Sequence, residues 1–177
     1  MKSKLYLVGL IVSVFLISSC ATMRVAVNYD KDINFSEYKT FRFVFPKQVS
    51  RGRGKNVNPF FTKDMMNEIR PIMIDKGYEE AGKEEEADLL LHFYTHVQNQ
   101  RDWVPATYRV GRWGRVHRTS PGHVVHYKEG TLGIDIVDQE KKALVWQGIG
   151  KGVLDRTNPQ KSFVEAVEEV LAQFPPK

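Results

Sequence analysis

The sequence of 177 residues contains a single cysteine, Cys20. An intramolecular disulfide is therefore excluded, and the stability of the fold must come from a packed apolar core. Its apolar run, Leu5 to Ile17, has 13 residues, whereas a membrane-spanning helix needs about 20. The chain also lacks a Gly-x-Ser-x-Gly element, and its one thiol has another expected use, so nucleophilic catalysis has no sequence support.

The amino-terminal segment has the layout of a secretory signal. Lys2 and Lys4 precede the apolar run, and small residues follow it. The tetrad Ile17-Ser18-Ser19-Cys20 resembles a bacterial lipoprotein signal, which implies that Cys20 becomes the lipid-modified first residue. We therefore predict a signal peptide over residues 1–19, a lipidated terminus with a very short tether over 20–22, and one α+β domain over 23–177. The alternatives are a signal with ordinary cleavage, an uncleaved anchor and a buried helix.

The residue after the cysteine bears on the location. In the lipoproteins that this start resembles, an aspartate there can retain the protein in the inner membrane. Ala21 stands here, so we expect a cell-envelope protein held by its lipid in the outer membrane, on the periplasmic face or the surface.

The charge balance is mildly basic. The chain has 26 Lys and Arg against 21 Asp and Glu, and loss of Lys2 and Lys4 lowers the excess from +5 to +3. Outside the cytosol the available polyanions are phospholipid headgroups and envelope glycans, so we expect an anionic envelope lipid or glycan, or another envelope protein, and no nucleic acid.

Hydrophobic periodicity predicts the elements of the domain. Alternation of apolar residues indicates strands over 23–30, 40–45, 124–138 and 143–154, and the apolar run 87–97 indicates a central strand. Spacing of three and four predicts helices from Asn58-Pro59 to Gly77, with a kink or break near Pro71, and over 162–174, with a capping box at Ser162 and Glu165. The fold class is α+β, a mainly antiparallel sheet of about five strands with two amphipathic helices on one face.

Several short motifs occur in a defined order between residues 34 and 148, and the resemblance that they carry spans roughly residues 23 to 175. They are Asn34-Phe35-Ser36-Glu37-Tyr38-Lys39-Thr40-Phe41, Lys76-Gly77-Tyr78, Ala87-Asp88-Leu89-Leu90, Gly130-Thr131-Leu132-Gly133-Ile134-Asp135-Ile136-Val137-Asp138 and Val145-Trp146-Gln147-Gly148. Together with the lipoprotein start, they resemble the bacterial lipoprotein family called domain of unknown function 4136. The resemblance implies an envelope lipoprotein with an α+β domain and offers no catalytic residues.

Candidate catalytic groups are few. His92 and His96 lie four apart in an expected strand, about 13 Å from each other, so one metal ion cannot bind both. Asp135 and Asp138 lie near a strand end, where Asp138 suits a hairpin turn. Gly148, Gly150 and Gly152 alternate in a strand, which indicates a bulge or a close contact with another backbone and not a dinucleotide site. We expect no metal and no cofactor.

The segment from Arg101 to Arg118 is the most suggestive part of the chain. Arginine binds phosphate and carboxylate in a bidentate manner, and Trp and Tyr suit a lipid interface or a sugar face. The candidate residues for binding an anionic ligand or a partner are Arg101, Trp103, Tyr108, Arg109, Arg112, Trp113, Arg115 and Arg118. The alternative is a long solvated hairpin whose aromatic side chains fold back onto the sheet.

These observations predict a lipid-anchored, non-enzymatic binding or scaffolding protein. Two alternatives remain open. One is a hydrolase acting on envelope glycan or lipid through Asp135, which requires a concave pocket and a second carboxylate or a histidine nearby. The other is a subunit of an outer-membrane assembly that docks through the 101–118 segment.

Overall fold

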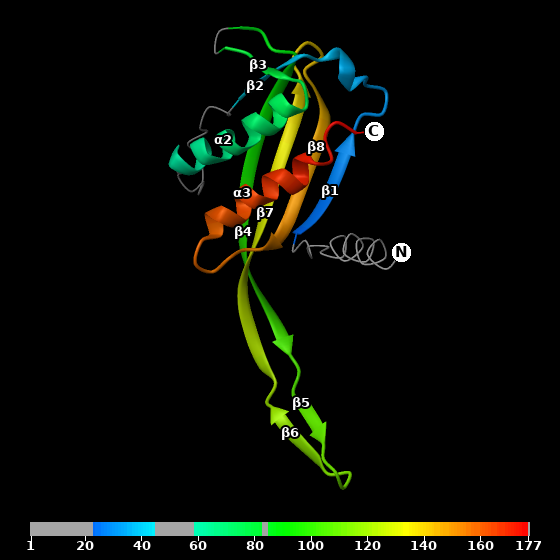
Figure 1. The fold of residues 1–177 in the computed structure, drawn as a ribbon, viewed down its shortest axis with the longest axis vertical. Coiled ribbons are helices and arrows are strands. Elements are labelled where there is room, and N and C mark those ends of the chain that lie inside the picture. The colour runs from blue at the N-terminus through cyan, green and yellow to red at the C-terminus, as the bar shows by residue number, and fades with distance from the viewer. Residues whose placement is uncertain (1–22, 45–58, 83–84, 177) are drawn as a thin grey trace, which may run out of the picture.

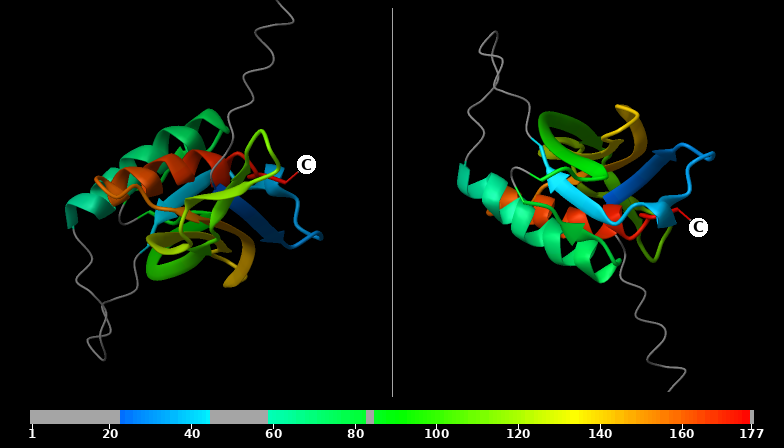
Figure 2. Two further views of the ribbon diagram at one scale, coloured as in Figure 1. Left: turned by 90° about the horizontal axis from the view of Figure 1, so that it is seen from below. Right: turned by 90° about the horizontal axis from the view of Figure 1, so that it is seen from above.

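The structure is a computed structural model that describes residues 23–44, 59–82 and 85–176. The predicted signal peptide, Cys20 and the basic run 51–55 lie outside these residues. The described chain folds as a sheet covered on one face by two helices, α2 (Pro59–Asp75) and α3 (Pro159–Leu171), as Figures 1 and 2 show. The α+β prediction is confirmed in this respect.

The main sheet has six strands in the spatial order β1 (Met23–Tyr29), β8 (Ala143–Val153), β7 (His123–Asp138), β4 (Leu89–Val104), β2 (Thr40–Phe43) and β3 (Glu79–Glu80). The first four pair antiparallel, whereas β2 lies parallel to both β4 and β3. The parallel pairing follows from α2, which carries the chain back along the sheet between β2 and β4. A separate pair, β5 (Thr107–Val110) and β6 (Val116–Ser120), makes a second small sheet, and the prediction of about five strands is approximate for the six-stranded main sheet.

Alternation along the central strands builds the core. The side chains that face the helices are fully buried on both β4 and β7: Leu89, Leu91, Leu132, Ile134 and Ile136. α3 buries the stripe Phe163, Val167, Val170 and Leu171 against this face. The short segment 34–39 forms a 3-10 turn at Phe35–Glu37, and the buried ring of Phe35 packs edge-on against Phe174.

Glycines in β8 let α3 approach the sheet closely. A Cβ atom at Gly148 would lie 2.5 Å from Cγ1 of Val170, and one at Gly150 would lie 2.9 Å from Cγ2 of the same residue. The prediction of a close contact with another backbone is wrong at these two glycines, because the nearest atoms belong to the side chains of Val170, Trp146 and Met23.

Both helices differ in one respect from their predictions. α2 runs without a break through Pro71, which is exposed. α3 begins at Pro159 and not at Ser162, because the side chain of Asn158 caps it by accepting a hydrogen bond from the backbone N–H of Lys161 at 3.1 Å. The predicted capping box is therefore wrong.

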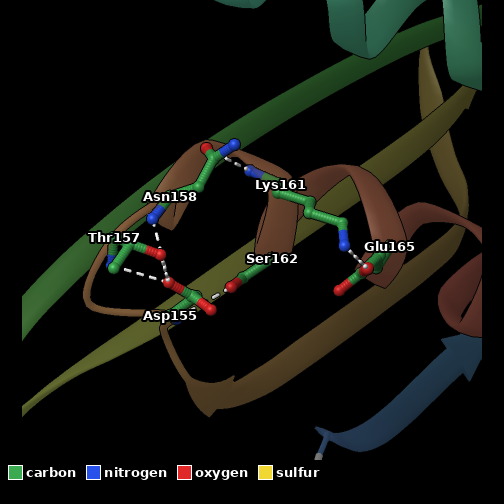
Figure 3. A network of polar contacts seen from close by, with 6 residues as sticks. All are labelled: Asp155, Thr157, Asn158, Lys161, Ser162 and Glu165. Atoms are coloured by element: carbon green, nitrogen blue, oxygen red, sulfur yellow. Dashed lines mark hydrogen bonds and ion pairs between the residues drawn. The ribbon is translucent and has the colours of Figure 1, made fainter.

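The residues of that box have other partners, which Figure 3 shows. The hydroxyl of Ser162 accepts a hydrogen bond from the backbone N–H of Asp155 at 2.9 Å, and Glu165 forms an ion pair with Lys161 at 3.2 Å. The carboxylate of Asp155 accepts hydrogen bonds from the hydroxyl of Thr157 and from the backbone N–H groups of Asn158 and Thr157, which lower its pKa to about 2. The turn before α3 is thus held by its own polar side chains.

Within the described ranges, neither helix has the length and hydrophobicity required to cross a bilayer.

Candidate functional site

A two-stranded arm projects from one end of the body, as Figure 1 shows. β4 and β7 pair along all 16 of their residues, and their outer halves continue beyond the part of the sheet that the helices cover. β5 and β6 extend the ribbon further. We define the arm as residues 98–126, which include every residue of the predicted binding segment. The other described residues make up the body.

Local sequence features shape the arm. Pro105 and Pro121 lie where the long ladder ends and the small one begins, in keeping with the missing N–H donor of proline. A register shift follows between Thr107 and Tyr108, where the hydroxyls of Thr107 and Thr119 hydrogen-bond at 2.8 Å. The end turn is closed by the N–H of Gly111, which donates to the carbonyl of Arg115 at 2.8 Å, and it contains Gly114 at φ +71°.

The eight predicted binding residues are all exposed and all lie on this arm. Trp103 is 60% exposed, Tyr108 63% and Trp113 88%. The aromatic side chains therefore do not fold back onto the body. Trp103 lies over Gly122, in the connection between β6 and β7, where a Cβ atom would come within 2.4 Å of its ring.

The end of the arm has an apolar side that the sequence analysis missed. Val110 pairs with Val116 across the hairpin, and both are more than 60% exposed. Tyr108 lies on the same side by alternation, and Trp113 stands in the turn between the strands. We call these four residues the arm tip. Two valines that flank a glycine-containing turn are a hairpin signal, and it could have identified the pair.

The arm and the body carry opposite charge. The arm holds five arginines against one acid, Asp102, a formal net charge of +4. The other described residues hold 19 acidic against 13 basic side chains. An anionic surface therefore attracts the arm and repels the body.

The five histidines are spread along β4, β6 and β7. His96 has a neighbour in Gln98, whose Nε2 lies 3.1 Å from its Nε2, and His92 stacks against Tyr94. Over the described ranges, no three His, Cys, Asp or Glu side chains come together as a metal site would require.

Asp135 lies on the open face of the sheet, opposite His92 in register, and accepts a hydrogen bond from Nε2 of Gln147 at 2.8 Å. A histidine is therefore close, but the position is on a sheet face and lines none of the hollows described below. The arrangement gives the hydrolase alternative no support.

A second polar cluster joins β2, β4 and β7 at the end of the sheet opposite the arm. Asp138 is 3% exposed, and its carboxylate accepts the hydroxyl of Tyr38 at 2.8 Å and the backbone N–H of Lys141 at 2.9 Å. Oδ2 of Asp88 accepts the backbone N–H groups of Lys39 and Thr40 at 2.7 and 2.9 Å. These contacts fasten the 34–40 segment to the sheet.

Hydrogen bonding sets the protonation of this cluster. The backbone N–H of Lys39 lowers the pKa of Asp88. Burial alone would raise the pKa of Asp138, but the hydrogen bonds from Lys141 and Tyr38 outweigh it, so its pKa is also lowered. A hollow of 810 Å³ lies here, yet these two carboxylates already serve contacts within the chain. A second hollow at this end, of 720 Å³, is lined by Tyr29, Lys39, Tyr78 and their neighbours.

The stability of the protein should fall in acid because of this cluster. A carboxyl group with a lowered folded pKa stabilises the fold above its unfolded value of about 3.9, and the effect is lost as the pH falls through the folded value. Urea unfolding at a series of pH values measures this. Asp138→Asn should lower the free energy of unfolding by about 2 kcal/mol at neutral pH and make its fall in acid shallower. An unchanged acid dependence would contradict this.

Comparison with known proteins identifies the fold. A family model described as a domain of unknown function, DUF4136, matches residues 25–176. No curated protein matches the chain in sequence. A DUF4136 family protein from Bacteroides thetaiotaomicron has a similar structure, with a TM-score of 0.50 and 16% identity over 87% of this chain and 96% of that chain.

A PDZ domain protein from Parabacteroides distasonis is also similar in structure, with a TM-score of 0.56 and 16% identity. The match covers 88% of this chain but 36% of that protein, so this chain spans about a third of its length. These identities establish a shared fold and nothing about activity. Because the family model covers most of the sequence, the chain belongs to the DUF4136 family.

Proposed function

We propose that this protein is a lipid-anchored, non-enzymatic component of a bacterial cell envelope, whose arm binds an anionic envelope component. Cys20 carries the lipid, and the α+β body holds the arm in place. The arm residues that make the contact are Arg101, Trp103, Tyr108, Arg109, Arg112, Trp113, Arg115 and Arg118.

The observation that carries the proposal is the exposure of large side chains on the arm. A two-stranded ribbon is at best marginally stable by itself in water, and exposed apolar groups add nothing to its folding. Trp103, Tyr108 and Trp113 are each 60% exposed or more, beside five arginines. Contiguous apolar side chains with a polar rim are typical of an interaction surface.

The anchor is tested by the mass of the mature amino terminus. We expect purified protein to begin at Cys20 with bound acyl chains, and Cys20→Ser to lack them and lose its stable membrane attachment. Two or more acyl chains hold a protein stably, at about 0.8 kcal/mol per buried CH₂. Ala21→Ser serves as the control and should keep the lipid. An unmodified Cys20 in the wild type would contradict the proposal.

The binding role is tested by photo-crosslinking from position 113 in intact cells. We expect adducts with an anionic lipid or glycan. Adducts with a different envelope protein would instead favour the assembly-subunit alternative, and an absence of adducts would count against a binding role. A crosslinker at Lys161, on the exposed side of α3, is the matched control.

A further inference from the structure

We propose that the arm lies flat along the surface of the membrane that holds the lipid anchor, with its tip against anionic phospholipid headgroups. This inference rests on the proposed lipidation of Cys20, and it names the partner of the arm. The protein then touches its membrane at two places, the acylated terminus and the arm tip.

The start of β1 fixes where the chain enters the body. Met23 pairs with Gly152, which pairs with Gly130, which in turn pairs with Val97. The first residue of β1 therefore lies level with the root of the arm, which begins at Gln98. β1 runs from there into the body, away from the arm, as Figure 1 shows. The anchored terminus and the arm thus share one end of the body.

The tether between Cys20 and Met23 is much shorter than the arm. Two residues, Ala21 and Thr22, separate Cys20 from Met23, and the three steps of chain reach at most about 10 Å. From Gln98 to the end turn the arm is roughly 45–50 Å long at about 3.3 Å per residue. The tether is far too short to lift the arm root one arm length away from the lipid surface.

The length, the unpaired backbone groups and the charge of the arm exclude an arm that points into the bilayer. A bilayer is about 40–45 Å thick, so an arm held upright from this root would cross its hydrocarbon core of about 30 Å. An open two-stranded ribbon has unpaired backbone groups along both edges, which hydrocarbon cannot satisfy. Five arginines add to the cost. With the root held close to the membrane, an arm whose tip reaches the headgroups must lie along the surface.

The chemistry of the arm fits that position. Arg112 and Arg115 flank Trp113 in the end turn, and Arg118 lies opposite Tyr108 in register. Tryptophan and tyrosine concentrate at the headgroup level of membranes, and each arginine adds attraction to anionic lipid. The net negative charge of the body turns it away from the same surface.

A second copy of the chain is the alternative partner for the basic arm, since the body is acidic. The acidic hollow at the far end of the sheet is the natural acceptor for an arginine-rich arm. Its two carboxylates Asp88 and Asp138 are already hydrogen-bonded within the chain, however. The residues that line this hollow are mostly polar, so they offer little apolar surface for the arm tip to pack against.

Tryptophan fluorescence of the purified lipidated protein in vesicles tests the inference. Trp103→Phe leaves Trp113 on the arm and Trp146, which is fully buried and serves as the internal reference. The vesicles are phosphatidylcholine with about 30% phosphatidylglycerol, or phosphatidylcholine alone, with a spin label at the headgroup level. We expect quenching of Trp113 in the anionic vesicles and none of Trp146.

Charge variants make the test specific. Changing Arg109, Arg112, Arg115 and Arg118 to glutamine should lower the ratio of membrane-bound to free arm by up to several hundred-fold, since each basic residue contributes roughly fivefold. The matched control changes Lys31, Lys63, Lys142 and Lys161 of the body to glutamine, and quenching should persist. Equal loss in both variants would overturn the inference.

The outcomes separate this inference from the proposed function. A lipidated Cys20 with unquenched Trp113 in anionic vesicles overturns the inference and leaves the anchor standing. Crosslinks from position 113 to a second copy, without lipid quenching, overturn it as well. If mass spectrometry finds Cys20 unmodified, the proposed anchor fails. Quenching of Trp113 by added anionic vesicles would still support the contact between tip and lipid, and absence of quenching would overturn it.

Discussion

Trp146→Ala should lower the free energy of unfolding by about 3–5 kcal/mol, a large share of the 5–15 kcal/mol typical of a domain. The Trp146 side chain is fully buried, and its ring packs edge-on against Phe174 at 5.2 Å between centroids. It also fills the space above Gly148, where a Cβ atom would lie 2.3 Å from the ring. Alanine would leave a cavity between β8 and α3, and urea unfolding monitored by circular dichroism measures the loss.

The same substitution on the arm is the matched control. Trp113 is 88% exposed, so Trp113→Ala should change the free energy of unfolding by no more than about 0.5 kcal/mol. A comparable loss at both positions would mean that the arm tip packs against the body. Among the described residues, Nε1 of Trp146 has no hydrogen-bond partner, so Trp146→Phe should cost less than the alanine variant.

Removal of the arm from the unlipidated Cys20→Ser protein should abolish its binding to anionic vesicles and leave the body folded. In the proposed variant, an Asn-Gly turn replaces residues 101–126 and joins Gln100 to Tyr127, which already lie opposite each other in register. Asn-Gly is the preferred two-residue connection of a hairpin. The free energy of unfolding should stay within about 1 kcal/mol, because the removed side chains lie outside the core.

Vesicle co-sedimentation and urea unfolding of the same preparation check both parts of this expectation. A second variant of the unlipidated protein that keeps the arm and changes only Asp102→Asn is the control, and it should bind at least as well as its parent because it removes the single acid of the arm. A body that unfolds without the arm would show that the ribbon contributes to the core. Undiminished binding without the arm would place the anionic contact elsewhere.

Much of the fold could be predicted from hydrophobic periodicity. The alternation in 124–138 and 143–154 predicted β7 and β8. A strand with one covered face places its apolar side chains on that face, at every second residue. The stripe of α3 was equally clear, since Phe163, Val167 and Val170 recur at helical spacing. Family membership followed from motifs spread over the same elements.

The sequence was less informative where no core imposes a pattern. The outer half of β4 and the strands β5 and β6 extend beyond the part of the sheet that the helices cover, so their side chains need not alternate between apolar and polar, and the segment 99–122 looked irregular. Helix boundaries failed for a different reason. Ser162 and Asn158 can both cap a helix, and only the position of Asp155 decides which of them does.

The sequence by itself determined that the chain has the α+β fold of the DUF4136 family, and it predicted which residues bind an anionic partner. It did so because periodicity and residue chemistry are local properties. Only the tertiary structure decided that all eight candidate residues stand on one arm, and that this arm leaves the body at the level of Met23. Those facts depend on strand register between residues more than a hundred positions apart, such as Met23 and Gly152, and no local pattern encodes such a pairing.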